Sequence, residues 1–166
     1  MYIKKLKETL DKVDFSNLNK IVDAIQNSKS IAIIGNGGSA STAEHMACDL
    51  NLLGYNATSL NSISTITAFA NDYDFDEIYM RQIENLKPDV LIAISASGNS
   101  PNIIKATSIL NIVCMTTIAF CGFDGGQLKS NVDFNIHVPI NNYEIVEDIH
   151  LIISHMIKCE LIKRKQ

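Results

Sequence analysis

Five short apolar runs, separated by segments with helical spacing, constrain the fold of this chain most strongly. The runs are rich in isoleucine, valine and alanine, as expected of strands that are covered on both faces. Strands that alternate with helices across short turns form right-handed βαβ units. The sequence therefore predicts an α/β fold with a parallel sheet, whose strands occupy residues 30–35, 57–60, 89–95, 114–120 and 134–138.

The segments between these runs carry apolar residues three or four positions apart, which is the spacing of a helix with one buried face. No linker, repeat or low-complexity segment interrupts the chain. We therefore expect a single domain over residues 1–166, with residues 1–28 as an N-terminal helical segment that packs on it. Helices are expected over 2–13, 16–27, 40–53, about 62–70, 75–85, 101–111 and 142–164.

Composition and charge argue against several classes of protein. Apolar residues make up 46% of the 166 residues and charged residues 19%, which suits a globular domain with a sizeable core. The net charge of −4 gives no electrostatic basis for binding nucleic acid or an anionic membrane. No apolar run approaches the roughly 18 residues of a membrane span, and the N-terminus lacks the pattern of a signal peptide.

The four cysteines lie in apolar or helical stretches and form no CxxC pair. They are therefore expected to be reduced thiols in the core of a cytoplasmic protein rather than disulfides. These residues are Cys48, Cys114, Cys121 and Cys159.

Two strand ends are alike and lack side chains suited to a core. The first strand runs into GNGGS at 35–39, and the third runs into SASGNSP at 95–101. In parallel α/β sheets, ligands bind beyond the carboxyl ends of the strands, where backbone N–H groups and a helix N-terminus favour a phosphate. Neither loop has the pattern of a P-loop or a dinucleotide fingerprint. The two together indicate a phosphate-bearing ligand, although ordinary turns with serine N-caps remain the alternative.

Acidic and imidazole groups gather in two of the predicted helices. His45 and Asp49 are one turn apart on the helix that follows the first loop, so they share a face. Glu147, His150 and His155 interrupt the otherwise apolar last helix. Such groups near the mouth of a ligand site can act as an acid–base pair or bind a metal, and structural histidines are the alternative.

Four motifs resemble those of the SIS (sugar isomerase) domain, and within it those of the phosphoheptose isomerases. They are GNGGSASTAEHMACDL at 35–50, ANDYDFDEIYMRQ at 70–82, ISASGNSPNIIKA at 94–106 and VEDIHLIISHMI at 146–157. The likeness runs from about residue 16 to residue 160. It implies a three-layer α/β/α sandwich with a five-stranded parallel sheet, assembled as a homotetramer whose active sites lie between subunits.

The resemblance also implies an activity and roles for individual residues. The activity is conversion of sedoheptulose 7-phosphate to D-glycero-D-manno-heptose 7-phosphate by proton transfer through an enediol, in the cytoplasm, with zinc in some members (one ion per subunit) and no organic cofactor. Asp49 and His155 are implied to be catalytic, and His45, Asp49, Glu147 and His155 to be the metal positions. The implied substrate-binding residues are Asn36, Gly37, Gly38, Ser39, Asp49, Asn71, Asp72, Ser95, Ala96, Ser97, Ser100 and Glu147, with the phosphate held by the three serines of the second loop.

Three residues depart from the family's usual pattern. Asp49 stands where the heptose isomerases usually carry Glu, Glu147 where they usually carry Gln, and Ala96 where a Thr is expected. The alternative function is a non-catalytic SIS module that binds a sugar phosphate or a protein partner. The acid at position 49 and the histidines at 45 and 155 favour an enzyme, since a binding module needs none of them. The isomerising half of an aminosugar enzyme fits less well, because such a chain normally carries two SIS copies.

Overall fold

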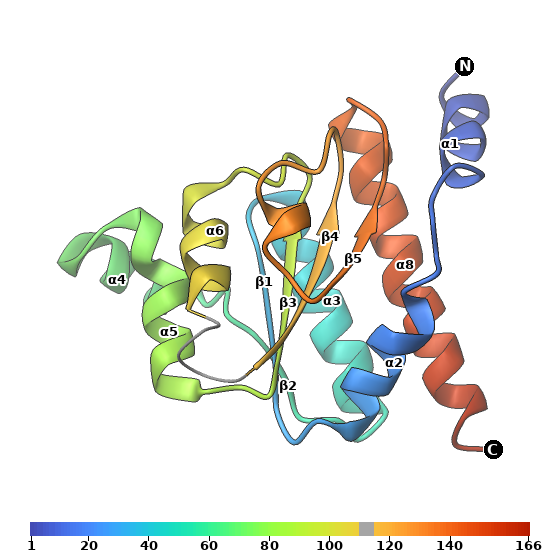
Figure 1. Ribbon diagram of the computed structural model, residues 1–166. Coiled ribbons are helices and arrows are strands. Elements are labelled where there is room, and N and C mark those ends of the chain that lie inside the picture. Colours follow the sequence, from blue (N-terminus) through green and yellow to red (C-terminus); the bar gives the residue numbers. More distant parts are fainter. Residues whose placement is uncertain (110–114) are drawn as a thin grey trace.

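The computed structural model describes residues 1–109 and 115–166. Its sheet has five parallel strands in the order β2-β1-β3-β4-β5 (Figure 1), which confirms the predicted fold class. The end of the helix expected over 101–111 and the start of the strand expected over 114–120 fall on residues outside the described ranges. The strands are β1 (Ile31–Gly35), β2 (Ala57–Ser59), β3 (Val90–Ser95), β4 (Thr116–Cys121) and β5 (Phe134–His137).

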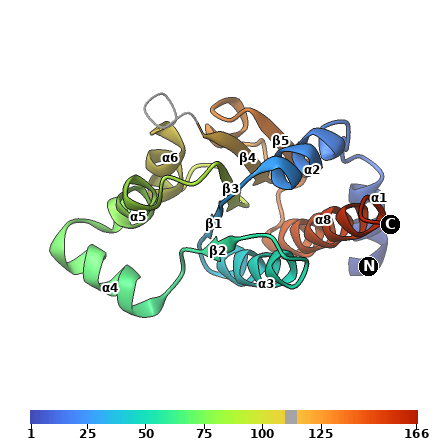
Figure 2. The same ribbon diagram turned by 90° about the horizontal axis from the view of Figure 1, so that it is seen from below.

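Helices cover both faces of the sheet, as the view from below in Figure 2 shows. On one face lie α2 (Leu18–Asn27), α3 (Gly38–Leu52) and α8 (Tyr143–Lys163), and on the other lie α5 (Ile78–Leu86) and α6 (Pro101–Ser108). Two short 3-10 helices, η1 (Phe75–Glu77) and η2 (Leu128–Ser130), lead into α5 and β5. Among the described residues, none of the helices combines the length and apolarity that crossing a membrane takes.

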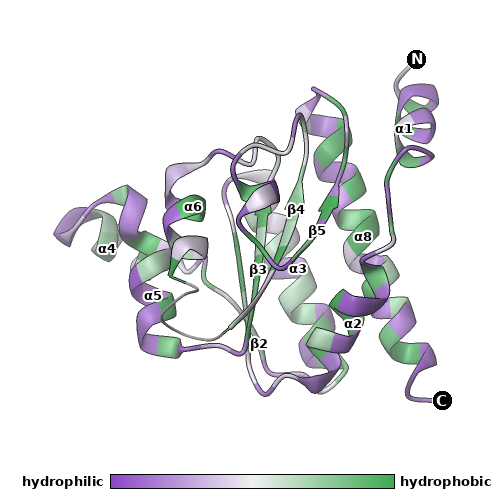
Figure 3. Ribbon diagram, viewed as in Figure 1, coloured by the Kyte–Doolittle hydropathy of each residue, from purple (hydrophilic) through white to green (hydrophobic). Residues whose placement is uncertain are grey.

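The strands separate two apolar cores, because successive strand residues point to opposite faces. In β1, Ile31 and Ile33 pack with α2, α3 and α8, whereas Ala32 and Ile34 pack with α5 and α6. All five residues of this strand are buried. The hydropathy view in Figure 3 shows the same division, with apolar residues on the sides of the helices that face the sheet. The sheet is therefore a rigid base for the loops at its carboxyl edge.

Two helices lie at the periphery of this sandwich. α1 (Tyr2–Leu10) stands beside α8, and α4 (Ile63–Asp72) extends away from the body of the molecule (Figure 1). α1 ends three residues before the predicted end, because the chain turns there to bring Val13 into the core. α4 has no buried residue. Both helices thus expose more of their surface than their sequence patterns alone indicate.

The thiols are only partly where the sequence predicts them. Cys48, Cys121 and Cys159 are free, as expected. Cys121 is buried, but Cys48 and Cys159 are exposed on α3 and α8, so placing those two in the core was wrong. Each lies on the outward side of a helix whose other side packs inward. Cys114 lies outside the described residues.

His150 of α8 is a fully buried histidine with no hydrogen-bond partner on either ring nitrogen. Its ring lies 6.1 Å from that of Phe120, centroid to centroid, against the sheet. Burial lowers the pKa of His150 to about 4, because the charged imidazolium would lose its hydration there. The histidine is therefore neutral in the folded protein down to mildly acidic pH.

Replacing His150 with leucine is expected to make the protein more resistant to acid. In the unfolded chain the imidazole has its ordinary pKa near 6.5, so as the pH falls below that value the unfolded state binds a proton that the folded state rejects. This contribution destabilises the wild type progressively between about pH 6.5 and pH 4. The free energy of unfolding of the variant, relative to the wild type, should rise by roughly 2–3 kcal/mol over that range. Urea unfolding at several pH values measures it, and a difference that stays constant with pH contradicts it.

Candidate active site

Two loops lie side by side at the carboxyl edge of the sheet. The glycine loop (residues 35–39) follows β1, and the serine loop (residues 95–100) follows β3, which pairs directly with β1. An amide pair joins them: Asn36 Nδ2 donates to Asn102 Oδ1, and Asn102 Nδ2 donates to Asn36 Oδ1, both at 2.9 Å. Asn102 is buried in the first turn of α6. The loops therefore form one surface rather than two independent turns.

A cavity of about 110 Å³ opens between the two loops and the start of α8. It brings together the three predicted phosphate serines and four more of the predicted substrate-binding residues, Asn36, Ser39, Ala96 and Glu147. Ser100 is the N-cap residue of α6, but its hydroxyl makes no capping hydrogen bond and has only a long contact, of 3.5 Å, with Ser95 Oγ, so it can turn toward a ligand. The cavity is lined by Asn36, Ser39, Ile94, Ser95, Ala96, Ser97, Ser100, Tyr143 and Glu147.

The serine loop is held by close backbone packing at Gly98. This residue has φ +64°, which favours glycine, and a Cβ there would lie 2.1 Å from the carbonyl oxygen of Gly125. The carbonyl of Gly98 accepts a hydrogen bond from the N–H of Leu128 at 3.0 Å, and its own N–H donates to Ser95 Oγ at 3.2 Å. The loop is thus pressed against the turn that follows β4, and its backbone conformation is fixed.

Glu147 lies over the first residue of α3. A Cβ added to Gly38 would overlap the Glu147 carboxylate, so glycine lets the acid take this position, and a larger residue would displace its side chain. Burial raises the pKa of Glu147, and the nearby carboxylates of Glu144 and Asp148 raise it further. Glu147 also lines the serine-loop cavity, so its carboxyl group forms part of the cavity wall.

A second polar group forms farther along the same two helices. His45 and Asp49 of α3 face His155 of α8, with 3.0 Å between the Nε2 atoms of the two histidines. His45 Nε2 lies 3.5 Å from Asp49 Oδ2. Asp49 is buried, whereas both histidines are exposed. We call His45, Asp49 and His155 the histidine–aspartate group.

The histidine–aspartate group lies farther along α3 and α8 than Gly38 and Glu147, which stand at the serine-loop cavity. His45 is seven residues beyond Gly38 on α3, and His155 is eight residues beyond Glu147 on α8, so the separation is about 10–12 Å at the rise of an α-helix. Glu147 is therefore not part of the histidine–aspartate group, and its role as a metal ligand stays a prediction.

The histidine–aspartate group has the chemistry of a zinc site. Its three candidate donor atoms lie within 4.8 Å of one another. Two ligand atoms of a tetrahedral zinc site are about 3.3 Å apart, and the separations of 3.0 and 3.5 Å in this group bracket that value. Asp49 Oδ2 is buried without a hydrogen-bond partner, which is unfavourable unless a ligand satisfies it. The residues present therefore fit a metal ion held by two imidazoles and one carboxylate.

Comparison with known proteins decides the family. Residues 1–122 match the SIS domain. The chain is 37% identical to a phosphoheptose isomerase of Helicobacter pylori, with 98% of this chain and 88% of the relative covered. It is 39% identical to a probable phosphoheptose isomerase of Thermoplasma acidophilum, with 89% and 85% covered. The chain belongs to the phosphoheptose isomerase family.

A solved structure agrees with this assignment. The phosphoheptose isomerase of Neisseria gonorrhoeae superimposes with a TM-score of 0.88 at 28% identity, over 96% of this chain and 92% of that one. A phosphoheptose isomerase from Francisella tularensis gives the same TM-score at 27% identity. The family resemblance expected from the four motifs is confirmed.

Five of the implied substrate-binding residues do not line the cavity: Gly37 and Gly38 lie beside it in the glycine loop, Asp49 belongs to the histidine–aspartate group, and Asn71 and Asp72 lie on α4. Asn71 and Asp72 are exposed at the end of α4, where Asn71 Nδ2 donates to Asp72 Oδ1 at 2.9 Å. Neither lines the serine-loop cavity. Because α4 extends outward from the body of the molecule (Figure 1), both side chains are exposed to solvent in this member of the phosphoheptose isomerase family.

Sequence reasoning missed several residues that shape the site in this family member. Tyr79, which is buried in α5, donates through its hydroxyl to the carbonyl of Gly35 at 2.5 Å and so supports the glycine loop. Asn102 joins the two loops as described above. Lys158 of α8 lies with its Nζ 2.6 Å from Asp49 Oδ1. A signal for Lys158 was its spacing of three residues from His155, which places both on one face of the helix.

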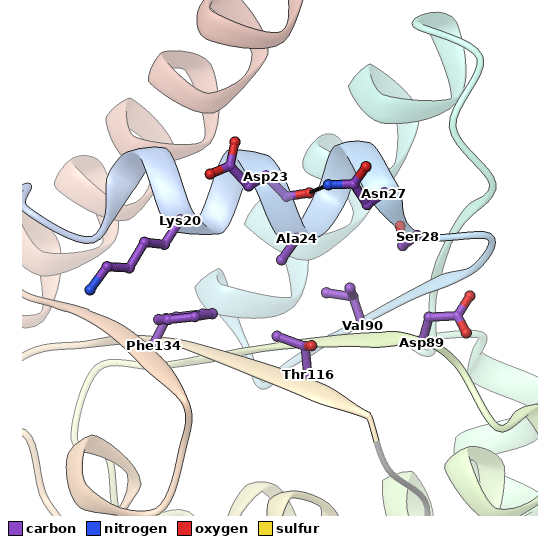
Figure 4. Close-up of a pocket in the computed structure, with 9 residues that line it drawn as sticks. All are labelled: Lys20, Asp23, Ala24, Asn27, Ser28, Asp89, Val90, Thr116 and Phe134. Carbon is purple, nitrogen blue, oxygen red and sulfur yellow. Dashed lines mark hydrogen bonds between the residues drawn. The ribbon is translucent and has the colours of Figure 1, made fainter.

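A larger cavity of about 430 Å³ lies at the opposite, amino edge of the sheet, between α2 and the starts of β3, β4 and β5 (Figure 4). Its polar groups are already engaged: Asp89 accepts hydrogen bonds from the N–H groups of Lys29 and Ser30, and Asn27 Nδ2 donates to the carbonyl of Asp23. It has neither a histidine nor a cluster of three serine hydroxyls like that of the serine loop. Size alone therefore does not identify the site, and the carboxyl edge remains the candidate.

Proposed function

We propose that this member of the phosphoheptose isomerase family converts sedoheptulose 7-phosphate to D-glycero-D-manno-heptose 7-phosphate. One observation supports this most directly: a cavity suited to phosphate and a carboxylate–imidazole group lie about 10–12 Å apart along α3 and α8. In this substrate the phosphate is on C7 and the reacting carbons are C1 and C2. The two polar groups thus match the two ends of an extended seven-carbon chain.

The serine loop supplies the phosphate-binding half. Hydroxyl groups of Ser95, Ser97 and Ser100 donate to phosphate oxygens, and the N-terminus of α6 favours their negative charge. No lysine or arginine lines this cavity in the described part of the chain, so neutral donors carry the interaction. The bare backbone of the glycine loop leaves room for the sugar to lie against it.

The histidine–aspartate group supplies the proton-transfer half. Isomerisation moves a proton between C1 and C2 through an enediol, which requires a base at the carbon and an acid at the oxygen. Asp49 and His155 share these tasks, because one offers a carboxylate and the other an imidazole on facing helices. Glu147, in the wall of the cavity, accepts hydrogen bonds from sugar hydroxyls.

His45, Asp49 and His155 would hold the metal ion. Zinc bound there, one ion per subunit, would supply a Lewis acid for the substrate carbonyl. Glu147 would have to approach from the serine-loop cavity to add a fourth ligand, and its carboxylate against Gly38 supports a role in sugar binding instead. The proposal therefore assigns the metal to three protein ligands.

The proposal includes a homotetramer in which subunits complete one another's sites. Exposed apolar residues on α1 and α4, such as Ile3 at 61% and Ile63 at 81% exposure, support association with other copies. Asn71 and Asp72 at the end of α4 are then placed to contact sugar in a neighbouring subunit. The free thiols of Cys48, Cys121 and Cys159 support action in the cytoplasm.

The experiment that tests the function is a direct assay. The purified protein, treated with EDTA or supplemented with zinc, is incubated with sedoheptulose 7-phosphate, and the aldose is followed by NMR. We expect the aldose to accumulate to equilibrium. Binding of the sugar phosphate without turnover under either condition would contradict the proposal and favour a non-catalytic SIS module.

A further inference from the structure

Lys158 brings a positive charge into the histidine–aspartate group. Its Nζ lies 2.6 Å from Asp49 Oδ1, and the side chains of lysine and aspartate are 32% and 8% exposed. The ion pair crosses from α8 to α3, beside the contact between His155 and His45. A mostly buried carboxylate has a large desolvation cost unless it is paired, and Lys158 is the positive group that offsets this cost for Asp49.

The two oxygens of Asp49 have different surroundings. Oδ1 is taken by Lys158, whereas Oδ2 has no partner and lies 3.5 Å from His45 Nε2. A cation bound by the two histidines would use Oδ2, which is the free oxygen. One carboxylate would then face two cations, an ammonium group on one oxygen and a divalent ion on the other.

We propose that Lys158 is an internal counter-ion that limits how tightly the histidine–aspartate group binds a divalent cation. It neutralises Asp49 when no metal is bound and keeps Oδ2 directed toward the histidines. It also repels a bound metal ion, whose distance from Nζ would be on the order of 4–5 Å given ordinary zinc–oxygen bond lengths. The inference rests on the metal-binding part of the proposed function but not on the isomerase reaction.

The test measures zinc affinity in the absence of sugar, by competition with a chromophoric chelator. The full-length protein is compared with Lys158→Met, which keeps most of the side-chain volume, and with Lys158→Arg, which keeps the charge. Lys163→Met is the matched control, since Lys163 lies on the same helix and is 72% exposed. Lys158→Met should bind zinc at least about tenfold more tightly than the wild type, because the repulsive charge is gone. Lys158→Arg and Lys163→Met should stay within about threefold of the wild type.

A second measurement separates this role from simple packing. Without its partner, buried Asp49 should lower the Tm of Lys158→Met in EDTA, and zinc should raise that Tm by more than it raises the Tm of the wild type. Lys158→Gln provides a neutral side chain with a hydrogen-bond donor if the methionine variant does not fold. Unchanged or weaker zinc affinity in the neutral variants overturns the proposal, and so does an absence of zinc binding in both the wild type and these variants.

The outcome is independent of the isomerase assay. Tighter zinc binding by Lys158→Met, together with no turnover of sedoheptulose 7-phosphate by the wild type, would support the counter-ion and overturn the proposed function. Turnover by the wild type, with zinc affinity unaffected by the neutral substitutions, would overturn the counter-ion alone.

Discussion

Alanine in place of His155 is expected to reduce kcat for sedoheptulose 7-phosphate by about 10²–10⁴-fold, which is the usual contribution of a general acid or base. The imidazole is one of two groups proposed to move the proton between C1 and C2. Because His155 is exposed on α8, its removal should disturb the packing of the core little. The loss should therefore appear in kcat with the protein still folded.

The measurement is the initial rate of aldose formation at saturating substrate, with circular dichroism as the check on folding. His137→Ala is the control, since His137 is a partly exposed histidine on β5 that contacts Lys129 and the carbonyl of Phe123 rather than the site. Asp49→Asn should lose activity to a similar degree. A folded His155→Ala protein that keeps more than about a tenth of the wild-type kcat would remove His155 from the mechanism.

The second large effect is expected on stability, from Gly98→Ala in the serine loop. The new Cβ would lie 2.1 Å from the carbonyl oxygen of Gly125, and the residue would also have to hold φ +64°. Backbone strain and overpacking each cost about 1–3 kcal/mol, so the free energy of unfolding should fall by about 3 kcal/mol or more. Because relief of the clash moves the loop, the KM for the sugar phosphate should rise as well.

Gly54→Ala is the matched control for this variant. Gly54 also has a positive φ, of +85°, but a Cβ there meets nothing within 4 Å. The free energy of unfolding of Gly54→Ala should fall only by the cost of the backbone conformation, about 1 kcal/mol, with no change in KM. Urea unfolding of the two variants measures the difference. Equal losses in both would show that the contact between Gly98 and Gly125 contributes little.

The sequence predicted the elements well because their apolar patterns are strong. The isoleucine-rich runs of β1 and β3 are short and fully buried, and α2 and α5 carry clear periodic faces. The order of the strands in the sheet was not predicted, since it depends on which helices pack on each face. The short end of α1 was also missed, because the turn that buries Val13 is a tertiary effect.

The candidate site was predicted in composition more than in arrangement. Serine and glycine loops can be recognised from residue types alone, and the cavity contains the residues expected from them. The pairing of His155 with His45, and of Glu147 with Gly38, depends on how α8 lies along α3, which no pattern in either helix reveals. Lys158 is one of many lysines in the sequence, and only the folded structure distinguishes it from a solvated charge.

The exposed position of α4 has a consequence for how the protein behaves on dilution. A helix of ten residues with no buried side chain is marginal in water, and its Ile66, Phe69 and Ala70 pack against the core only in part. In the proposed homotetramer, contacts with another copy would stabilise this helix and the position of Asn71 and Asp72 at its end. Specific activity should therefore fall as the enzyme is diluted through its dissociation range, and hydrogen exchange should accelerate in residues 63–72 over the same concentrations.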